Sequence, residues 1–226
     1  MAKKKISRKE LLKRPDEFLT LSSRAVNFFN AHTNVFKYVG LAIALIVVVY
    51  LGLNTYMRYI NKKGQNAYNL AYDTLSQNMR PDAGPEGLKK SEELFDKVID
   101  DYGLSKAARL ALAQVAYLQF ADKKYDEAIA LYKKFSKKVS GNRDFESLTN
   151  LALAACYEAK GDMKKAIQTL NPILNRPAHP FRETAMLSLE RLYRLDGQPE
   201  KAREILKEFV EEYKTSPFLP MAKARL

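Results

Sequence analysis

A frame of tyrosine, glycine and alanine occurs twice in this chain, with the two copies 36 residues apart. The first copy is "YEAKGDMKKAI", residues 157–167, and the second is "YRLDGQPEKAR", residues 193–203. Fixed periods of roughly 20–50 residues are typical of solenoids, in which each unit packs mainly against its neighbours. The spacing therefore predicts stacked supersecondary units in this part of the chain.

A small residue marks the second helix of each unit, and apolar residues follow it at offsets of four and seven. Those offsets lie on one face of an α-helix and predict the stripe that each second helix buries. The spacings between the small residues are 37, 38 and 36, which predicts four helix pairs. The small residues are Ser91, Ala128, Ala166 and Ala202. The stripe residues are Phe95, Val98, Tyr132, Phe135, Leu170, Ile173, Leu206 and Phe209.

Each residue type in the frame answers a geometric demand. Tyr157 is expected near the end of a first helix, with its ring on the face that meets the second helix. Gly161 supplies the left-handed conformation that ends the first helix, and Asp162 caps the second. Ala166 has only a methyl group where the two helices cross. The same roles are expected for Tyr193, Gly197, Ala202 and, in an earlier unit, Ala128.

A second constraint is the stretch from Tyr38 to Met57, "YVGLAIALIVVVYLGLNTYM", which contains no charged residue. A helix of this length spans roughly 30 Å, the thickness of a bilayer hydrocarbon core. Only Asn54 and Thr55 are polar, so the polar stripe of a buried globular helix is absent. No small-residue cleavage site follows the stretch. We therefore predict an uncleaved transmembrane helix over 38–57.

The charge balance bears on orientation. Residues 1–37 contain nine Lys or Arg and three Asp or Glu, a net charge of +6, and residues 58–226 carry the same net charge in a far longer segment. The positive-inside rule over the whole tail predicts a basic cytoplasmic tail, 1–37, and a repeat domain, 58–226, on the other side of the membrane. Cations counted only near the two ends of the apolar stretch lean slightly the other way.

The tail has an apolar pattern with two interpretations. Apolar residues recur at three- and four-residue spacing, which fits an amphipathic helix on the inner leaflet. The alternative is a solvated basic tail ahead of the membrane helix. The residues of the pattern are Phe18, Leu21, Ala25, Phe28, Phe29, Val35 and Phe36.

The sequence offers no recognisable reactive chemistry. Helix formers dominate, and alternating β-branched runs are missing, which favours an all-α fold. His32 and His179 have no partner at ligand or relay spacing, and both are expected at solvated positions. Cys156 is expected to be a buried packing residue. Cations alternate with core residues rather than forming a nucleic-acid-binding motif. We predict no enzymatic activity, no metal, no cofactor and no nucleic-acid partner.

Over residues 65–226 the chain resembles the tetratricopeptide repeat family. Its pattern of leucine, small residue, tyrosine, glycine, alanine and an aromatic residue is met by Leu153, Ala154, Tyr157, Gly161 and Ala166, with Leu170 at the aromatic position. In the next unit Glu190 replaces the small residue. In the unit before, two extra residues are expected ahead of Tyr125. The resemblance implies a tetratricopeptide-like helical solenoid of about four helix pairs, preceded here by one transmembrane helix.

With its basic tail and single membrane pass, the chain is also similar to the bacterial inner-membrane ancillary subunit of the Sec translocon. That likeness implies a single-pass inner-membrane protein with a cytoplasmic N-terminus and periplasmic repeats. The implied partners are translocon subunits, periplasmic clients or chaperones, and membrane lipid around the anchor. The alternative is a structural scaffold, or a homo-oligomer, in a cell-envelope assembly complex. A membrane-tethered enzyme is a third, weaker interpretation.

The resemblance also implies where a partner binds, because such solenoids present a concave surface along their first helices. The family's basic clamp for a terminal carboxylate is not met, since Leu151 and Ala155 occupy its positions. The leucines have a competing role in packing adjacent helices. The groove-facing residues implied for partner binding are Leu148, Leu151, Ala155, Glu158, Leu187, Arg191 and Arg194.

Overall fold

The computed structural model describes residues 17–79, 85–176 and 179–226, and within these ranges every regular element is a helix. The chain divides into two compact units, Met1–Tyr56 and Met57–Leu226. Residues 1–16, which contain seven of the nine cations of the predicted basic tail 1–37, lie outside the described ranges. The helices are α2 (Glu17–Ala31), α3 (Thr33–Asn78), α4 (Pro85–Asp101), α5 (Lys106–Ala121), α6 (Tyr125–Lys138), α7 (Arg143–Ala159), α8 (Met163–Leu174), α9 (Arg182–Leu195), α10 (Pro199–Glu212) and α11 (Leu219–Ala224).

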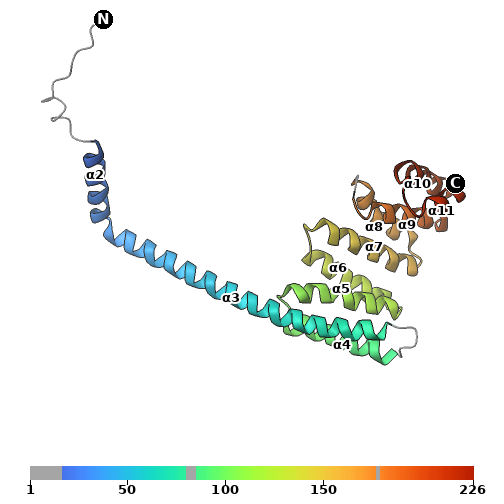
Figure 1. Cartoon of the computed structure of the whole chain (residues 1–226), viewed down its shortest axis with the longest axis horizontal. Coiled ribbons are helices and arrows are strands. Elements are labelled where there is room, and N and C mark those ends of the chain that lie inside the picture. The colour runs from blue at the N-terminus through green and yellow to red at the C-terminus, as the bar shows by residue number, and fades with distance from the viewer. Residues whose placement is uncertain (1–16, 80–84, 177–178) are drawn as a thin grey trace, which may run out of the picture. The chain divides into compact units, whose positions relative to one another are not determined.

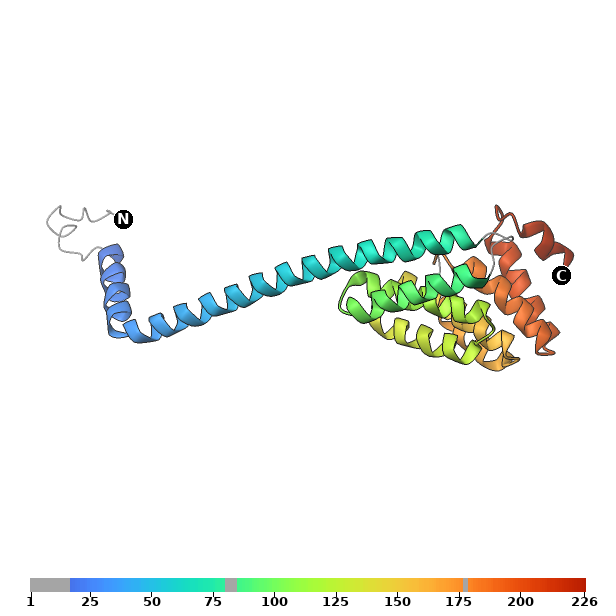
Figure 2. The ribbon, with the colours of Figure 1, turned by 90° about the horizontal axis from the view of Figure 1, so that it is seen from below.

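The first unit consists of α2 and the beginning of α3, which meet at a bend at His32 (Figures 1 and 2). Aromatic contacts hold the bend. The Phe29 and Phe36 rings stack with centroids 3.8 Å apart, and Phe28 meets Phe36 edge to face at 6.1 Å. Phe28 and Phe29 nevertheless remain 57% exposed. The bend therefore presents an aromatic surface.

The apolar part of α3 is uncovered by the rest of the chain. It is the one helix in the described ranges that is long and apolar enough to cross a membrane, and none of its most apolar window is buried. Its Leu, Ile and Val side chains are about half exposed, as on an isolated helix. Such a surface in water is unfavourable by roughly 25 cal/mol for each Å² of apolar area. This stretch is a candidate membrane span.

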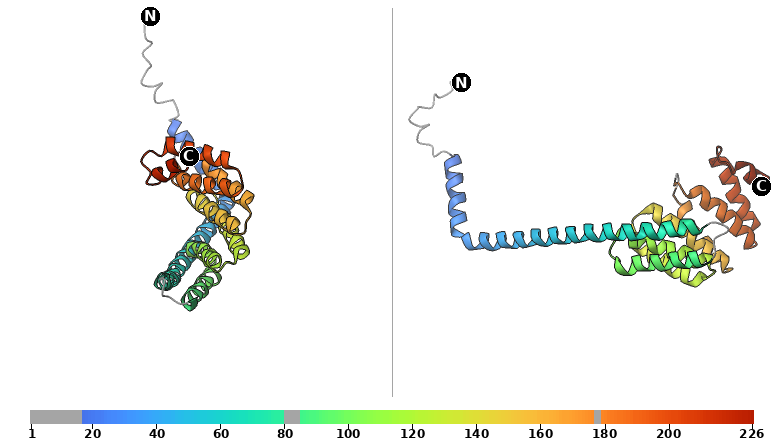
Figure 3. Two further views of the ribbon diagram at one scale, coloured as in Figure 1. Left: turned by 90° about the vertical axis from the view of Figure 1, so that its right-hand side faces the viewer. Right: turned by 60° about the horizontal axis from the view of Figure 1, so that its bottom comes forward.

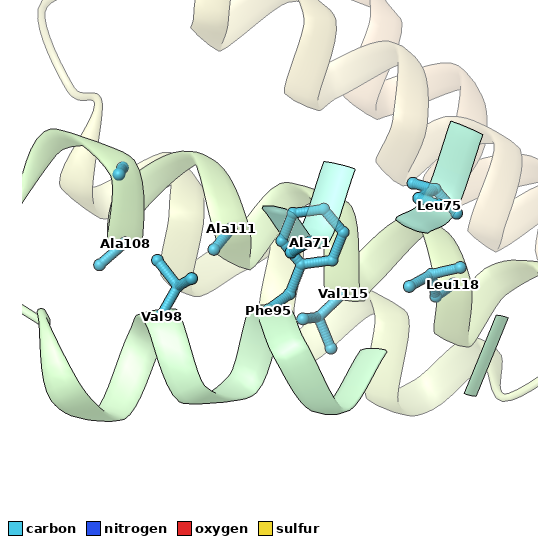
Figure 4. Close-up of a cluster of buried hydrophobic side chains, with 9 residues drawn as sticks. Ala71, Leu75, Phe95, Val98, Ala108, Ala111, Val115 and Leu118 are labelled. Carbon is cyan, nitrogen blue, oxygen red and sulfur yellow. The ribbon is translucent and has the colours of Figure 1, made fainter. Parts of the chain in front are cut away.

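The second unit begins with the last turns of α3, which pack against α4 and α5. Phe95 of α4 points toward Ala71 of α3, and both side chains are fully buried (Figure 4). The approach is close at Gly64, where a Cβ would lie 2.7 Å from Ser105 Oγ. Asn61 Oδ1 accepts a hydrogen bond from the Lys106 backbone N–H at 2.8 Å. The same helix that contains the apolar span thus supplies the first helix of the first pair.

The helices of this unit stack as four pairs in chain order, from α3–α4 to α9–α10 (Figures 1 and 3). The small residues of all second helices are buried, with Ala166 and Ser91 at 0% exposure. All eight stripe residues that follow them are buried as well. This arrangement confirms the predicted all-α solenoid of four helix pairs. The short helix α11 then packs on α10 through the fully buried Ala222.

Candidate protein-binding groove

The first helices of consecutive pairs line an open groove of about 340 Å³ across α3, α5 and α7. Its floor consists of Tyr132 and Phe135, the buried stripe residues of α6. On its rim, Tyr117 is 40% exposed and Leu148 is 43% exposed. A hollow of this size that leaves large apolar side chains accessible is suited to side chains of another molecule. The lining residues are Tyr68, Leu110, Ala113, Gln114, Tyr117, Tyr132, Phe135, Phe145, Leu148, Thr149 and Ala152.

Polar groups in the groove are few and are paired with one another. Gln114 Nε2 donates a hydrogen bond to Tyr68 Oη at 3.2 Å, which joins α5 to α3. Burial raises the pKa of Tyr68 above its usual value, so the phenol is neutral near pH 7. Thr149 donates to the Phe145 carbonyl oxygen of its own helix at 2.6 Å. The groove therefore offers apolar contact and uncharged hydrogen-bonding groups.

The residues predicted to face a groove are divided between two hollows. Leu148 lines the groove just described. Leu187 and Arg191 line a separate hollow of about 260 Å³ beside α9 and α11. Leu151 packs partly against the core between α7, α8 and α9, and Ala155 is partly buried. The structure does not gather the seven residues at one site.

The predicted charges of the groove pair with neighbours in the structure. Arg191 forms an ion pair with Glu158, which joins the first helices of the third and fourth pairs. Arg194 forms an ion pair with Glu190 one turn earlier on α9. Both arginine side chains are 51% exposed, so water screens them. These charges contribute to contacts between and within first helices.

The repeated frame has the same local geometry in each copy. Gly161 has φ +80° and Gly197 has φ +71°, both in the left-handed region. The Asp162 N–H bonds the Tyr157 carbonyl oxygen at 2.9 Å, and the equivalent bond from Gln198 to Tyr193 is 2.8 Å. These bonds satisfy carbonyl groups at the end of the first helix. The buried alanines Ala128, Ala166 and Ala202 lie where the second helix crosses the first.

A lysine side chain makes a cation–π contact with the tyrosine ring in each copy of the frame. The Lys165 ammonium lies 5.8 Å from the Tyr157 ring centroid, and the Lys201 ammonium lies 5.6 Å from that of Tyr193. Both lysines occupy the first turn of a second helix. The pairs of the frame are thus joined by a cation–π contact as well as by apolar packing.

The backbone at Lys123 shows that the second helix pair, α5–α6, has the same frame, which the sequence alone did not show. It has φ +61°, in the left-handed region that Gly161 and Gly197 adopt. The Lys124 N–H bonds the Gln119 carbonyl oxygen at 2.9 Å, as in the other two copies. Ala116 and Ala128 are both fully buried at the spacing of Ala154 and Ala166. The two extra residues expected before Tyr125 are therefore not present.

That misplaced frame explains why the sequence missed the main residues of the groove. Leu110, Ala113 and Tyr117 of α5 occupy the positions that Leu148, Leu151 and Ala155 occupy in α7. Identifying these residues from the sequence required the correct alignment of the second helix pair. Lys123 occupies the position that is glycine in the other copies, so the glycine spacing did not indicate that alignment. The buried alanine spacing alone would have been sufficient to find it.

The prediction for His179 was wrong, because its side chain is only 7% exposed. Nε2 lies 3.3 Å from Ser147 Oγ and 3.8 Å from an Asp144 carboxylate oxygen. Nδ1 accepts a hydrogen bond from the Phe181 N–H, so in the neutral ring Nε2 carries the proton. A Ser-His-Asp relay needs the carboxylate on the other nitrogen and a serine that substrate can reach. Ser147 is 1% exposed, and the arrangement is structural.

The fourth pair contains buried charges that the apolar frame did not predict. Glu190 is 1% exposed at the position where the second and third pairs have Ala116 and Ala154, and its second oxygen lies 3.1 Å from Arg225 Nη1. Arg182, 7% exposed, donates to the Leu174 carbonyl oxygen at 3.1 Å and pairs with Glu208 and Glu212 of α10. Each buried charge has at least two partners, as its desolvation requires.

Two further site predictions concern reactive groups. Cys156 is fully buried between the second and third pairs, as predicted for a packing residue. Burial raises the pKa of its thiol to about 11, so little thiolate is present near pH 7. In the part of the chain that the structure describes, no cluster of His, Cys, Asp or Glu is placed to hold a metal ion.

Comparisons with known proteins identify the repeats. A family model described as a tetratricopeptide repeat-like domain matches residues 27–184, and a tetratricopeptide repeat model matches residues 185–216. A search of curated proteins finds no match.

Similar solved structures include the nearly identical TPR-like repeats of a protein assigned as a kinesin light chain in Podosopora anserina. One crystal structure, of a single-residue variant of those repeats, has 18% identity and a TM-score of 0.57, and a second crystal structure has 20% identity and a TM-score of 0.56. Each comparison covers 72% of this chain and 82% of the other. At this level of identity the likeness concerns the fold.

Proposed function

Because this chain belongs to the tetratricopeptide repeat-like domain family, we propose that it is a membrane-anchored, noncatalytic module that binds other proteins. The observation that carries the proposal is the open groove of α3, α5 and α7, with Tyr117 and Leu148 exposed above an aromatic floor. Extended or helical segments of a partner bind such grooves by inserting apolar side chains.

The anchor is the apolar part of α3. Its side chains are uncovered within the chain, and a lipid bilayer covers them without desolvating any charge. The exposed phenylalanine rings at the α2–α3 bend support this assignment, because helices that lie on a membrane surface bury Phe and Leu side chains in the lipid boundary. We assign α2 to the membrane surface on the same grounds, in preference to a solvated tail.

We further propose that the membrane is a bacterial inner membrane, with the tail in the cytoplasm and the repeats in the periplasm. The nine cations of residues 1–37 support this orientation, as does the resemblance to the ancillary subunit of the Sec translocon. The partners would then be translocon subunits and the envelope proteins or chaperones that emerge nearby. Anchorage confines the groove to the membrane and raises its effective concentration for these partners.

The test is photo-crosslinking of the full chain in intact cells, with the crosslinker at a groove position and captured partners identified by mass spectrometry. Leu148→Asp places a charge in the groove and should reduce capture of translocon subunits and envelope proteins about tenfold. Leu195→Asp is the matched control, since Leu195 is 57% exposed outside the groove lining. Equal capture by wild type and Leu148→Asp would contradict the proposal.

Topology is tested separately. A reporter that is active only in the periplasm, fused after Leu226, should be active. Activity of a cytoplasmic reporter at the same position would overturn the proposed partners, whereas the groove itself would be unaffected.

A second candidate function is a self-associating scaffold. Phe218 is 49% exposed and lines the hollow beside α9 and α11, and Leu226 is 42% exposed. Such residues become buried when two copies meet. Sedimentation of the full chain in detergent micelles decides between the two functions, because a tight dimer that Phe218→Asp dissociates favours the scaffold and a monomer favours the groove.

A further inference from the structure

A cationic pocket adjoins the apolar groove. It has a volume of about 300 Å³ and lies where α5 and α7 begin and α6 ends. Leu110 and Phe145 line both hollows, so the two are adjacent. The remaining lining residues are Lys106, Arg109, Lys138, Val139, Ser140 and Asn142. The lining thus holds three cations and no carboxylate.

Lys106, Arg109 and Lys138 differ in their ion pairing from the arginines of the fourth helix pair. Arg182, Arg191 and Arg194 all form ion pairs, whereas Lys106, Arg109 and Lys138 form none among the described residues. A concentration of like charge without counter-charge is unfavourable within the free protein. It raises the local potential and attracts an anionic group.

Neighbouring elements reinforce the positive potential. The amino ends of α5 and α7 lie at the pocket and carry partial positive charge, whereas the carboxyl end of α6 carries partial negative charge, so two favourable helix ends outweigh one unfavourable end. The acidic residues in the first turn of α7 contact other groups. Glu146 accepts from the Gly141 N–H at 2.9 Å and pairs with Arg176, while Asp144 lies 3.8 Å from His179. Neither carboxylate forms an ion pair with Arg109 or Lys138.

We propose that the groove and this pocket form one composite site for a protein segment in which apolar side chains are followed by carboxylates. The apolar side chains would enter the groove beside Tyr117 and Leu148, and the carboxylates would pair with Lys106, Arg109 and Lys138. This inference rests on the proposed function and specifies the class of partner. An aromatic and aliphatic floor next to the cations favours a peptide over a phosphate backbone.

The test uses the full chain in detergent micelles and two fluorescent peptides. One contains alternating Phe and Leu followed by Asp residues, and the other has Lys in place of every Asp. Fluorescence anisotropy should show the acidic peptide binding about tenfold tighter, and the preference should shrink between about 0.05 M and about 0.5 M NaCl as salt screens the charges.

The decisive variant is Arg109→Glu with Lys138→Glu, which should abolish or reverse the preference for the acidic peptide. The matched control is Lys134→Glu with Lys164→Glu, which makes the same change in net charge at exposed positions outside both linings. This control should retain the preference to within about twofold, because distant exposed charges are screened.

The outcomes separate this inference from the proposed function. Equal binding of both peptides that Leu148→Asp abolishes would overturn the acidic preference and leave the groove in place. A preference that survives in the Arg109→Glu and Lys138→Glu variant would also overturn it. Binding of neither peptide would overturn both conclusions. A single-stranded oligonucleotide that binds more tightly than the acidic peptide would identify the pocket as a phosphate site instead.

Discussion

The third helix pair, α7–α8, and the fourth, α9–α10, share one backbone frame but close it with different chemistry. In the third pair Ala154 lies 3% exposed opposite the fully buried Ala166. In the fourth pair Glu190 takes the place of Ala154 and is held by Arg194 and Arg225. The glycine and alanine positions of both pairs are otherwise the same. The frame therefore specifies where helices cross, while the chemistry at the crossing varies as long as every buried group is satisfied.

Exchanging the alanine of the third pair and the glutamate of the fourth pair gives the largest expected effect on stability. Ala154→Glu would bury a carboxylate in the third pair, where Glu158 takes the place of the pairing Arg194, and would also overfill a close crossing. We expect a loss of about 4 kcal/mol or more in the free energy of unfolding, enough to melt the third pair. Glu190→Ala should cost much less, because it restores the alanine of the third pair. Urea unfolding of the full chain in detergent, followed by circular dichroism, measures both. Equal costs would show that the two crossings are equivalent.

Removing the cations from the fourth pair sharpens the same comparison. Arg194→Ala with Arg225→Ala leaves the Glu190 carboxylate buried without a partner, at an expected cost of about 3 kcal/mol. Adding Glu190→Ala to this double variant should recover stability, because the uncompensated charge is removed. A triple variant less stable than the double variant would disprove the role of Glu190 as a paired charge.

The interface between the second and third pairs is apolar, unlike the charged crossing of the fourth pair, and an alkaline titration tests it. Burial raises the pKa of Cys156 from its ordinary 9.0 to about 11, so the unfolded chain loses its thiol proton first as pH rises. The free energy of unfolding should be unaffected below pH 9 and fall by roughly 2–3 kcal/mol as pH rises toward 11. Cys156→Ala should remove this part of the fall. A pH profile unchanged by the substitution would contradict the assignment.

The glycine of the third pair provides a smaller effect. A Cβ at Gly161 would meet nothing within 4 Å, so Gly161→Ala introduces backbone strain at φ +80° and no clash. We expect a loss of about 1–2 kcal/mol. A wild-type unfolding midpoint in this variant would mean that the turn relaxes to another conformation.

The second pair allows the opposite change. Lys123 already occupies a left-handed backbone conformation at φ +61°, so Lys123→Gly should raise the free energy of unfolding by at most about 1 kcal/mol. Lys134→Gly is the control and should destabilise by about 1 kcal/mol, because Lys134 is exposed in the interior of α6, where glycine adds chain entropy to the unfolded state and relieves no strain. A stability gain at both positions would indicate that backbone strain is not the cause.

The fold was predictable because its signals are local and repeated. Buried alanines and stripe residues at helical spacing define each second helix, and all the predicted stripe residues are buried. The candidate site was less predictable. Leu148 was found, but the α5 side of the groove was missed because Lys123 concealed the frame. The burial of His179 and Glu190 was missed because each has a partner more than 30 positions away, Ser147 and Arg225 respectively.

By itself, the sequence determined the apolar stretch of α3 and the order and spacing of the helix pairs. The first follows from a continuous run of apolar residues, and the second follows from residue types that recur at a fixed spacing. Only the tertiary structure decided that the hollow lies across α3, α5 and α7, and that unpaired cations adjoin it. The physical reason is that a groove is the space that side chains of neighbouring pairs leave unfilled. That space depends on how pairs stack, and no single repeat encodes it.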